Sequence, residues 1–109
     1  MTAAETEALL GKLGSALVAI GGFGRYRTQC AGPSPWTGPM WDACLVVADD
    51  VTSYIVAEGR GPTRDSAWSR CLSNALSDPK NLFRLPDAVR AESPEELEIR
   101  LAAVEGGPR

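Results

Sequence analysis

Residues 57–77 read AEGRGPTRDSAWSRCLSNALS and predict a strand end, a turn and an amphipathic helix. The two glycines and Pro62 are expected to end the strand, because proline lacks the amide that a β-ladder needs. Thr63 offers the side-chain oxygen of a helix N-cap. Apolar residues then recur at helical spacing: Trp68, Leu72, Ala75 and Leu76. We therefore predict a helix over about 63–77 whose apolar stripe covers a sheet.

Three segments before this helix have the patterns of strands, and we place them at about 23–30, 40–48 and 51–58. The first alternates, with one face formed by Tyr26, Thr28 and Cys30 and the other by Arg25, Arg27 and Gln29. The second is apolar apart from Asp42, as in a central strand buried on both faces. In the third, one face is expected to carry Val51, Ile55 and Ala57. Asp49 and Asp50 are expected to form the turn between the last two strands.

Helices are predicted at both ends of the chain. Thr2 and Glu5 form a capping-box pattern before a helix over about 3–20, whose Gly11 and Gly14 are expected to pack closely against a neighbour, and Gly21-Gly22 ends it. Ser93-Pro94-Glu95-Glu96 begins a last helix that ends at Gly106-Gly107-Pro108.

The stretch between the last two helices is expected to be irregular. Asp78-Pro79 should end the helix over 63–77. Leu82, Phe83 and Leu85 should then fold onto the core, and 88–91 is a candidate short edge strand. Together the segments predict one α+β domain over residues 1–109. It is a two-layer sandwich of three or four antiparallel strands, with helices 3–20 and 63–77 on one face and the last helix at an end.

The charge and hydropathy of the chain argue against several classes of function. The chain is 44% hydrophobic and 23% charged, with a formal net charge of −3, so no strong basic field attracts nucleic acid or anionic lipid. No apolar run is long enough to span a bilayer, and residues 1–20 lack the basic start of a signal peptide. We therefore expect a protein of the cytoplasm without a membrane partner.

Catalytic and metal-binding residues are sparse. The chain has no His, which removes the usual general base and the commonest zinc ligand. Cys30, Cys44 and Cys71 lack paired spacing and sit at apolar positions, so we interpret them as reduced structural thiols. We expect no metal, no cofactor and no enzymatic activity. The remaining enzymatic interpretation is one that uses carboxylates alone, and four lie in the sheet region: Asp42, Asp49, Asp50 and Glu58.

Residues 31–39, AGPSPWTGP, form a Pro- and Gly-rich loop that carries Trp36. An aromatic side chain in such a loop is either folded back over the sheet edge or offered to a partner. We single out Trp36, Arg25 and Arg27 as candidate protein-binding residues. The alternative is a nucleic-acid-binding surface, with phosphate contacts from Arg25, Arg27, Arg60 and Arg64.

Two family resemblances accompany these patterns. The region over about residues 36–77 resembles small bacteriophage α/β sandwich proteins. The matching residues are Ala57-Glu58-Gly59, Thr63 and, in the helix, Ala67, Arg70, Cys71 and Leu76, although Gly61-Pro62 is an insertion and no Pro follows Thr63. The order helix, three strands, helix resembles the double-stranded RNA-binding domain. There the matching helix start carries consecutive lysines, where this chain has Arg64 followed by Asp65.

The phage resemblance implies a phage or prophage accessory protein acting in the bacterial host cytoplasm. The expected function is then non-enzymatic binding of a host protein or protein complex. Its most concrete version is an anti-CRISPR-like inhibitor of a host antiviral defence complex. The alternative is a nucleic-acid-binding module with a fold like that of the double-stranded RNA-binding domain.

Overall fold

A computed structural model describes residues 1–36, 38–77 and 83–105 of the chain. The elements follow in the order α1 (Ala3–Gly21), β1 (Arg25–Ala31), β2 (Trp41–Ala48), β3 (Ser53–Gly61), α2 (Arg64–Leu76), the short 3₁₀ helix η2 (Asp87–Val89) and α3 (Pro94–Glu105). The predicted α+β class and the order of the main elements are confirmed. Leu82, Asp78-Pro79 and Gly106-Gly107-Pro108 lie outside the described residues.

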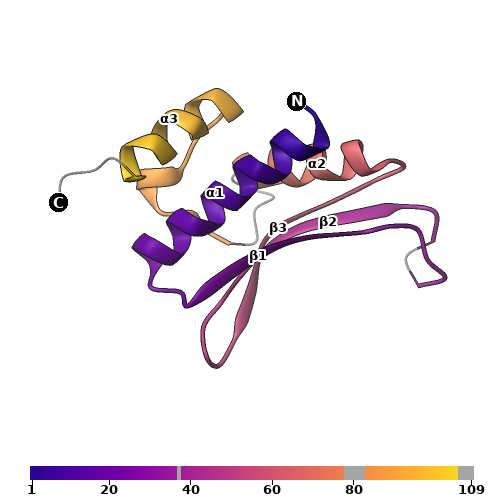
Figure 1. Cartoon of the computed structure of the whole chain (residues 1–109), viewed down its shortest axis with the longest axis horizontal. Helices are drawn as coiled ribbons and strands as arrows, with labels where there is room; N and C mark the ends of the chain where they lie inside the picture. The colour runs from indigo at the N-terminus through magenta and orange to yellow at the C-terminus, as the bar shows by residue number, and fades with distance from the viewer. Residues whose placement is uncertain (37, 78–82, 106–109) are drawn as a thin grey trace.

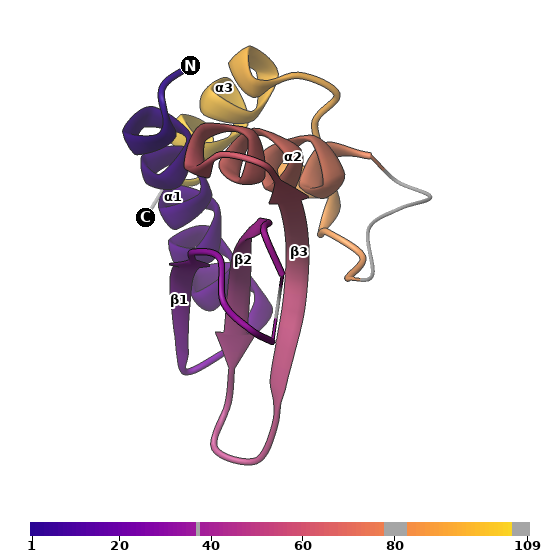
Figure 2. The same cartoon turned by 90° about the vertical axis from the view of Figure 1, so that its right-hand side faces the viewer.

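The sheet is antiparallel with strand order β1-β2-β3. Helices α1 and α2 cover one of its faces, as predicted (Figure 1). Helix α3 does not pack at an end of the sandwich: it lies against α1 on the side away from the sheet (Figures 1 and 2). Leu97 and Leu101 are buried there, so the last helix adds a layer above the helices.

The predicted fourth strand over 88–91 is wrong. Asp87–Val89 form a 3₁₀ turn in which the Val89 amide donates to the Pro86 carbonyl, at 3.0 Å. Val89 and Ala91 are both buried, and Leu85 is buried nearby in sequence. This segment therefore serves as a plug under α3 rather than as a sheet edge, and it bears out the predicted burial of Leu85 and, in part, of Phe83.

The three predicted N-caps and the predicted end of α1 are formed. The Thr2 hydroxyl accepts from the Glu5 amide at 3.1 Å, and Glu5 Oε1 accepts from the Thr2 amide at 3.0 Å. Gly22 ends α1 in the left-handed conformation. Thr63 accepts from the amide of Ser66, 3.1 Å away. At the start of α3, the Ser93 hydroxyl accepts a hydrogen bond from the Glu96 amide at 3.1 Å.

The core lies between the helices and the covered face of the sheet. Its largest fully buried side chains include Trp68, Leu10, Leu13, Leu17, Leu45 and Val47. The predicted apolar stripe of α2 is confirmed, since Trp68 and Leu72 are buried. Strand β2 is buried from Ala43 to Ala48. It is the central strand that its apolar composition predicted.

A β-bulge changes the predicted alternation of β3. Leu45 of β2 pairs with Ala57, whereas the next residue, Val46, pairs with Ile55. Val56 is therefore an extra residue, and both Val56 and Ala57 enter the core. Ile55 instead points to the uncovered face, 47% exposed, and Val51 is exposed in the hairpin turn. The prediction that Val51, Ile55 and Ala57 share a face was wrong because period-two counting assumes no bulge.

Close approach of α2 explains the glycines at the end of β3. The prediction that Gly59, Gly61 and Pro62 end the strand fails for Gly59, which lies inside β3, but it is confirmed for Gly61 and Pro62, because β3 ends at Gly61. A Cβ atom on Gly59 would lie 2.1 Å from the Cys71 backbone nitrogen. Gly14 of α1 packs closely against a neighbour, as predicted, because a Cβ atom there would collide with the Tyr26 ring. The same prediction is wrong for Gly11, which faces open space.

Candidate functional site: the uncovered face of the sheet

The uncovered face of the sheet is the surface on which most of the predicted site residues lie. The strand register places there Arg25, Arg27 and Gln29 from β1, Asp42, Cys44, Val46 and Ala48 from β2, and Ser53, Ile55, Glu58 and Arg60 from β3. We call this set the open face. Cys44, Val46 and Ala48 are buried although no helix of the described residues packs on this face, because they lie on the central strand between the side chains of both neighbours.

Arg25 and Arg27 lie at the end of the open face next to the β2–β3 hairpin. They border a shallow hollow of about 140 Å³ whose lining includes Val46, Ala48 and Ser53. Both guanidinium groups are free of ion pairs within the described part of the chain. The hollow therefore combines an apolar floor with a basic border.

The hairpin turn beside Arg25 is set by Asp49, as predicted. Asp49 Oδ1 accepts from the amides of Val51 and Thr52, each at 2.8 Å. These two bonds, that of Thr52 first, lower the pKa of the Asp49 carboxyl, and the charge of Arg25 lowers it further. The charge of Arg25 therefore acts on the Asp49 carboxylate without an ion pair between them. The guanidinium group of Arg25 remains available on the open face.

Trp36 is the most exposed large hydrophobic side chain in the described residues, at 94%. Two backbone bonds close the loop beneath it: Ser34 donates to Gly38 at 3.1 Å, and Gly38 donates to Ser34 at 2.8 Å. The Ser34 hydroxyl also accepts from the Trp36 amide at 3.2 Å. Of the two alternatives for this side chain, the structure selects the one in which it is offered outward.

The structure does not bring Trp36 next to the two arginines. Arg25 pairs with Ala48 at the hairpin end, whereas Ala31 pairs with Asp42 at the other end of β1, where the Trp36 loop begins. Six residues at the rise of a β-strand separate Arg25 from Ala31 by about 20 Å. Figure 1 shows the loop at the end of the strands opposite the hairpin. A single partner would have to span the length of β1 to touch all three.

Arg60 and Arg64 occupy different surroundings from Arg25 and Arg27. Arg60 Nε lies 3.3 Å from Asp42 Oδ2 on the open face. Arg64 begins α2 and approaches Glu7 of α1, with 3.7 Å between Nη2 and Oε2. Two of the four arginines proposed for nucleic-acid binding thus already face carboxylates. The described residues supply no continuous basic stripe that connects the four.

Asp42 and Glu58 form a carboxyl pair at the Trp36 end of the open face. They line a hollow of about 340 Å³ together with Gln29, Cys30, Ala31 and Cys44. Burial raises the pKa of Glu58, the negative charge of Asp42 raises it further, and Arg60 opposes this. The Asp42 side chain is 18% exposed, and its Oδ1 is buried without a hydrogen-bond partner in the described residues. Glu58 is therefore easier to protonate than an ordinary surface carboxyl.

The three cysteines are free thiols, as predicted. Burial raises the pKa of Cys71 to about 12 and also raises the pKa values of Cys30 and Cys44. A thiol with a raised pKa holds little of the thiolate that nucleophilic or metal chemistry needs. No cluster of three or more His, Cys, Asp or Glu in the described ranges is placed to hold a metal ion.

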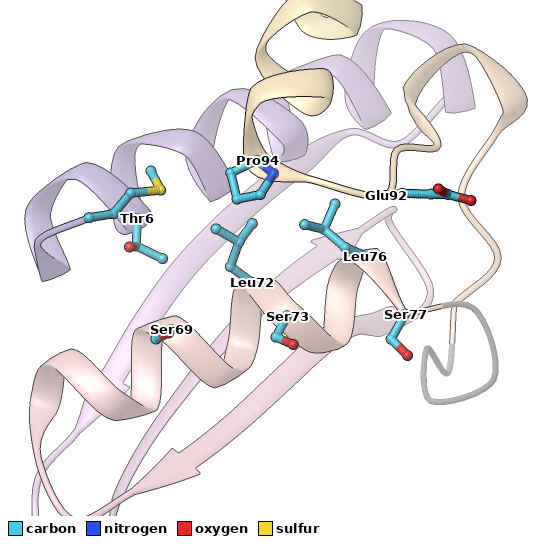
Figure 3. A pocket seen from close by; sticks show the side chains of 9 residues that line it. Thr6, Ser69, Leu72, Ser73, Leu76, Ser77, Glu92 and Pro94 are labelled. Carbon is cyan, nitrogen blue, oxygen red and sulfur yellow. The ribbon is translucent and has the colours of Figure 1, made fainter.

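A third hollow, of about 520 Å³, lies between α2 and the starts of α1 and α3 (Figure 3). Leu72, Leu76 and Pro94 point toward one another across it, and Glu92 is the charged residue of its lining. No local pattern in the sequence indicates this hollow, because it forms where α3 begins above α2. None of the residues predicted to form a site lines it.

The two long edges of the sheet also differ, and sequence reasoning did not detect this. Asn74 Nδ2 of α2 donates to the Glu58 carbonyl, and Arg70 Nη1 donates to the Arg60 carbonyl, each at 2.7 Å. Helix α2 therefore occupies hydrogen-bonding groups along β3. In the described part of the chain, β1 pairs only with β2 and no element covers its outer edge in this way.

Comparison with known proteins identifies no relative. No family model matches the chain, and neither the curated proteins nor the solved structures contain a match. The resemblances to phage sandwich proteins and to the double-stranded RNA-binding domain therefore have no support beyond the residues that suggested them. Among the described residues, every helix is too short or too polar to cross a bilayer.

Proposed function

We propose that this protein acts by binding another protein, without catalysis, through Trp36 and the open face of the sheet. The observation that carries the proposal is the 94% exposure of Trp36 on a loop closed by its own backbone bonds. A tryptophan side chain buries about 150–250 Å² on contact, worth about 4 to 6 kcal/mol before the costs of association. Tryptophan is also the side chain most enriched at interface hot spots, together with Tyr and Arg.

The open face supports the same function. A sheet with both faces buried would leave its side chains no room for a partner, but here Ile55, Arg25 and Arg27 reach solvent from one face. Apolar and arginine side chains beside each other are typical of interface cores and their borders. More specifically, we propose a phage accessory protein that binds and inhibits a host antiviral complex, as the sequence resemblance implies.

The test is capture of partners from host lysate on the tagged protein, with bound proteins quantified. We expect the double variant Trp36→Ala/Arg25→Ala to lose at least tenfold of a specific captured protein. Ile99→Ala is the matched control, because Ile99 is also strongly exposed but lies on α3, away from the sheet. Capture that is equal for the double variant, the control and the parent chain would refute the proposal.

A further inference from the structure

The outer edge of β1, which is unpaired in the described residues, indicates the conformation of a segment that could bind there. A strand at a sheet edge leaves alternate amides and carbonyls unpaired, ready to bond with another extended chain. Proteins commonly protect such edges with charged side chains, proline, a bulge or a covering element, and charged side chains exclude a like-charged strand more than an oppositely charged one. Residues Arg25–Ala31 contain no proline, and the bulge of this sheet lies between β2 and β3.

The opposite edge of the same sheet shows how this chain protects a strand. Helix α2 contacts β3 so closely that a side chain on Gly59 would meet its backbone. Asn74 and Arg70 then bond to two carbonyls of β3. The fold therefore closes one edge and, in the described residues, leaves the other open for seven residues.

Charge selects the kind of strand that fits. Arg25 and Arg27 project from the same face of β1, two residues apart, with no ion pair in the described ranges. Two copies joined edge to edge would place four arginine side chains on one face of the joined sheet, and like charges across strands are destabilising. An incoming strand with carboxylates at alternate positions would meet both arginines beside the hollow over Val46 and Ala48.

We infer that the outer edge of β1 receives an extended acidic segment of the partner protein as a fourth strand. Its backbone bonds to the free groups of β1, and its alternate carboxylates pair with Arg25 and Arg27 on the open face. This inference rests on the proposed function, because it specifies the segment of that partner. Trp36, at the far end of β1, then contacts the partner beyond the added strand.

The probe is a capped peptide as long as β1 that alternates Glu and Val, titrated into the isotopically labelled full chain. A Lys/Val peptide is its charge-reversed counterpart. Two further Glu/Val peptides carry N-methyl groups on either all the Glu amides or all the Val amides. Only one set of amides can face β1, so one methylated form should lose binding and the other should keep it.

We expect the Glu/Val peptide to bind saturably, at least tenfold tighter than the Lys/Val peptide, and to slow hydrogen exchange of β1 amides. The Arg25→Glu/Arg27→Glu variant should reverse this preference. Arg100→Glu, a charge reversal on α3, should leave it unchanged. Three results would each overturn the inference: no saturable binding at millimolar peptide, equal effects of both N-methylated forms, or an unchanged preference in the Arg25/Arg27 variant.

The outcome separates the inference from the proposed function. If Trp36→Ala/Arg25→Ala loses a lysate partner but no acidic peptide binds β1, partner binding stands and the added strand is wrong. If the peptide binds as described but the double variant captures the same proteins as the parent chain, the edge is a strand acceptor and the proposed function is wrong.

Discussion

Trp68 is 1% exposed between α2 and the sheet, whereas Trp36 is 94% exposed on the loop after β1. The covered face of the sheet holds the large apolar side chains of the core, and the open face holds arginines, carboxyl groups and Ile55. This contrast indicates that the covered face and the open face of the sheet have different roles. The covered face holds the fold together, and the open side is available for recognition. The following variants test this separation by the free energy of unfolding.

Trp68→Ala should give the largest effect. Replacing a fully buried tryptophan by alanine costs about 3–5 kcal/mol through lost burial and the cavity that remains. Urea unfolding of the variant against Ile99→Ala, an exposed position on α3, measures the difference. If both variants unfold at the same urea concentration, Trp68 does not belong to the core as described.

Gly59→Ala should rank second. A Cβ atom would lie 2.1 Å from the Cys71 nitrogen, so α2 must move away from β3, and overpacking of this kind costs about 1–3 kcal/mol. Gly11→Ala is the matched control, because nothing lies within 4 Å of its Cβ position and alanine favours a helix interior. The control should be slightly stabilised, and a tolerated Gly59→Ala would contradict the close contact.

Asn74→Ala should cost less, about 1 kcal/mol, because it removes one hydrogen bond to the Glu58 carbonyl at the β3 edge. Native-state hydrogen exchange of β3 amides should become faster in this variant. Ser73→Ala, at the neighbouring position of α2, serves as control. Unchanged exchange would show that the side chain does not protect this edge.

Glu58→Gln should have a small effect that depends on pH. Burial and the charge of Asp42 raise the pKa of Glu58 in the folded chain. Folding then favours the protonated form, so the parent chain loses stability as the pH rises through this pKa. Glutamine carries no charge, and the variant should be slightly more stable than the parent at neutral pH but not in acid. Unfolding curves at acid and neutral pH decide this, and a loss of stability at neutral pH would contradict it.

Much of the fold follows from local patterns. The caps at Thr2, Thr63 and Ser93 and the stripe of Trp68 and Leu72 are short-range signals, and each is formed. The bulge at Val56 and the third-layer position of α3 depend on packing between distant segments, so period counting did not find them. A run of three adjacent apolar residues, Ile55-Val56-Ala57, was the available hint that strict alternation is broken here.

The candidate site was predictable residue by residue but not as a surface. The exposure of Arg25 and Arg27 follows from the alternation of β1. Their distance from Trp36 follows from the register, which places Arg25 at the hairpin end of β1 and the start of the Trp36 loop at its other end. The Asp42–Glu58 pair depends on the register of β2 against β3, which one sequence does not specify. The difference between the β3 edge, which α2 covers, and the open β1 edge likewise depends on the position of α2.

Trp36→Ala tests the separation of the two sides most directly, because it should change binding and not folding. We measure the free energy of unfolding in urea and the amount of a specific captured partner on the same preparation. The account predicts a change of less than about 0.5 kcal/mol in unfolding, as for other exposed positions, together with at least a tenfold loss of capture. A variant that loses stability like a core substitution, or that captures its partner as well as the parent chain does, would contradict it.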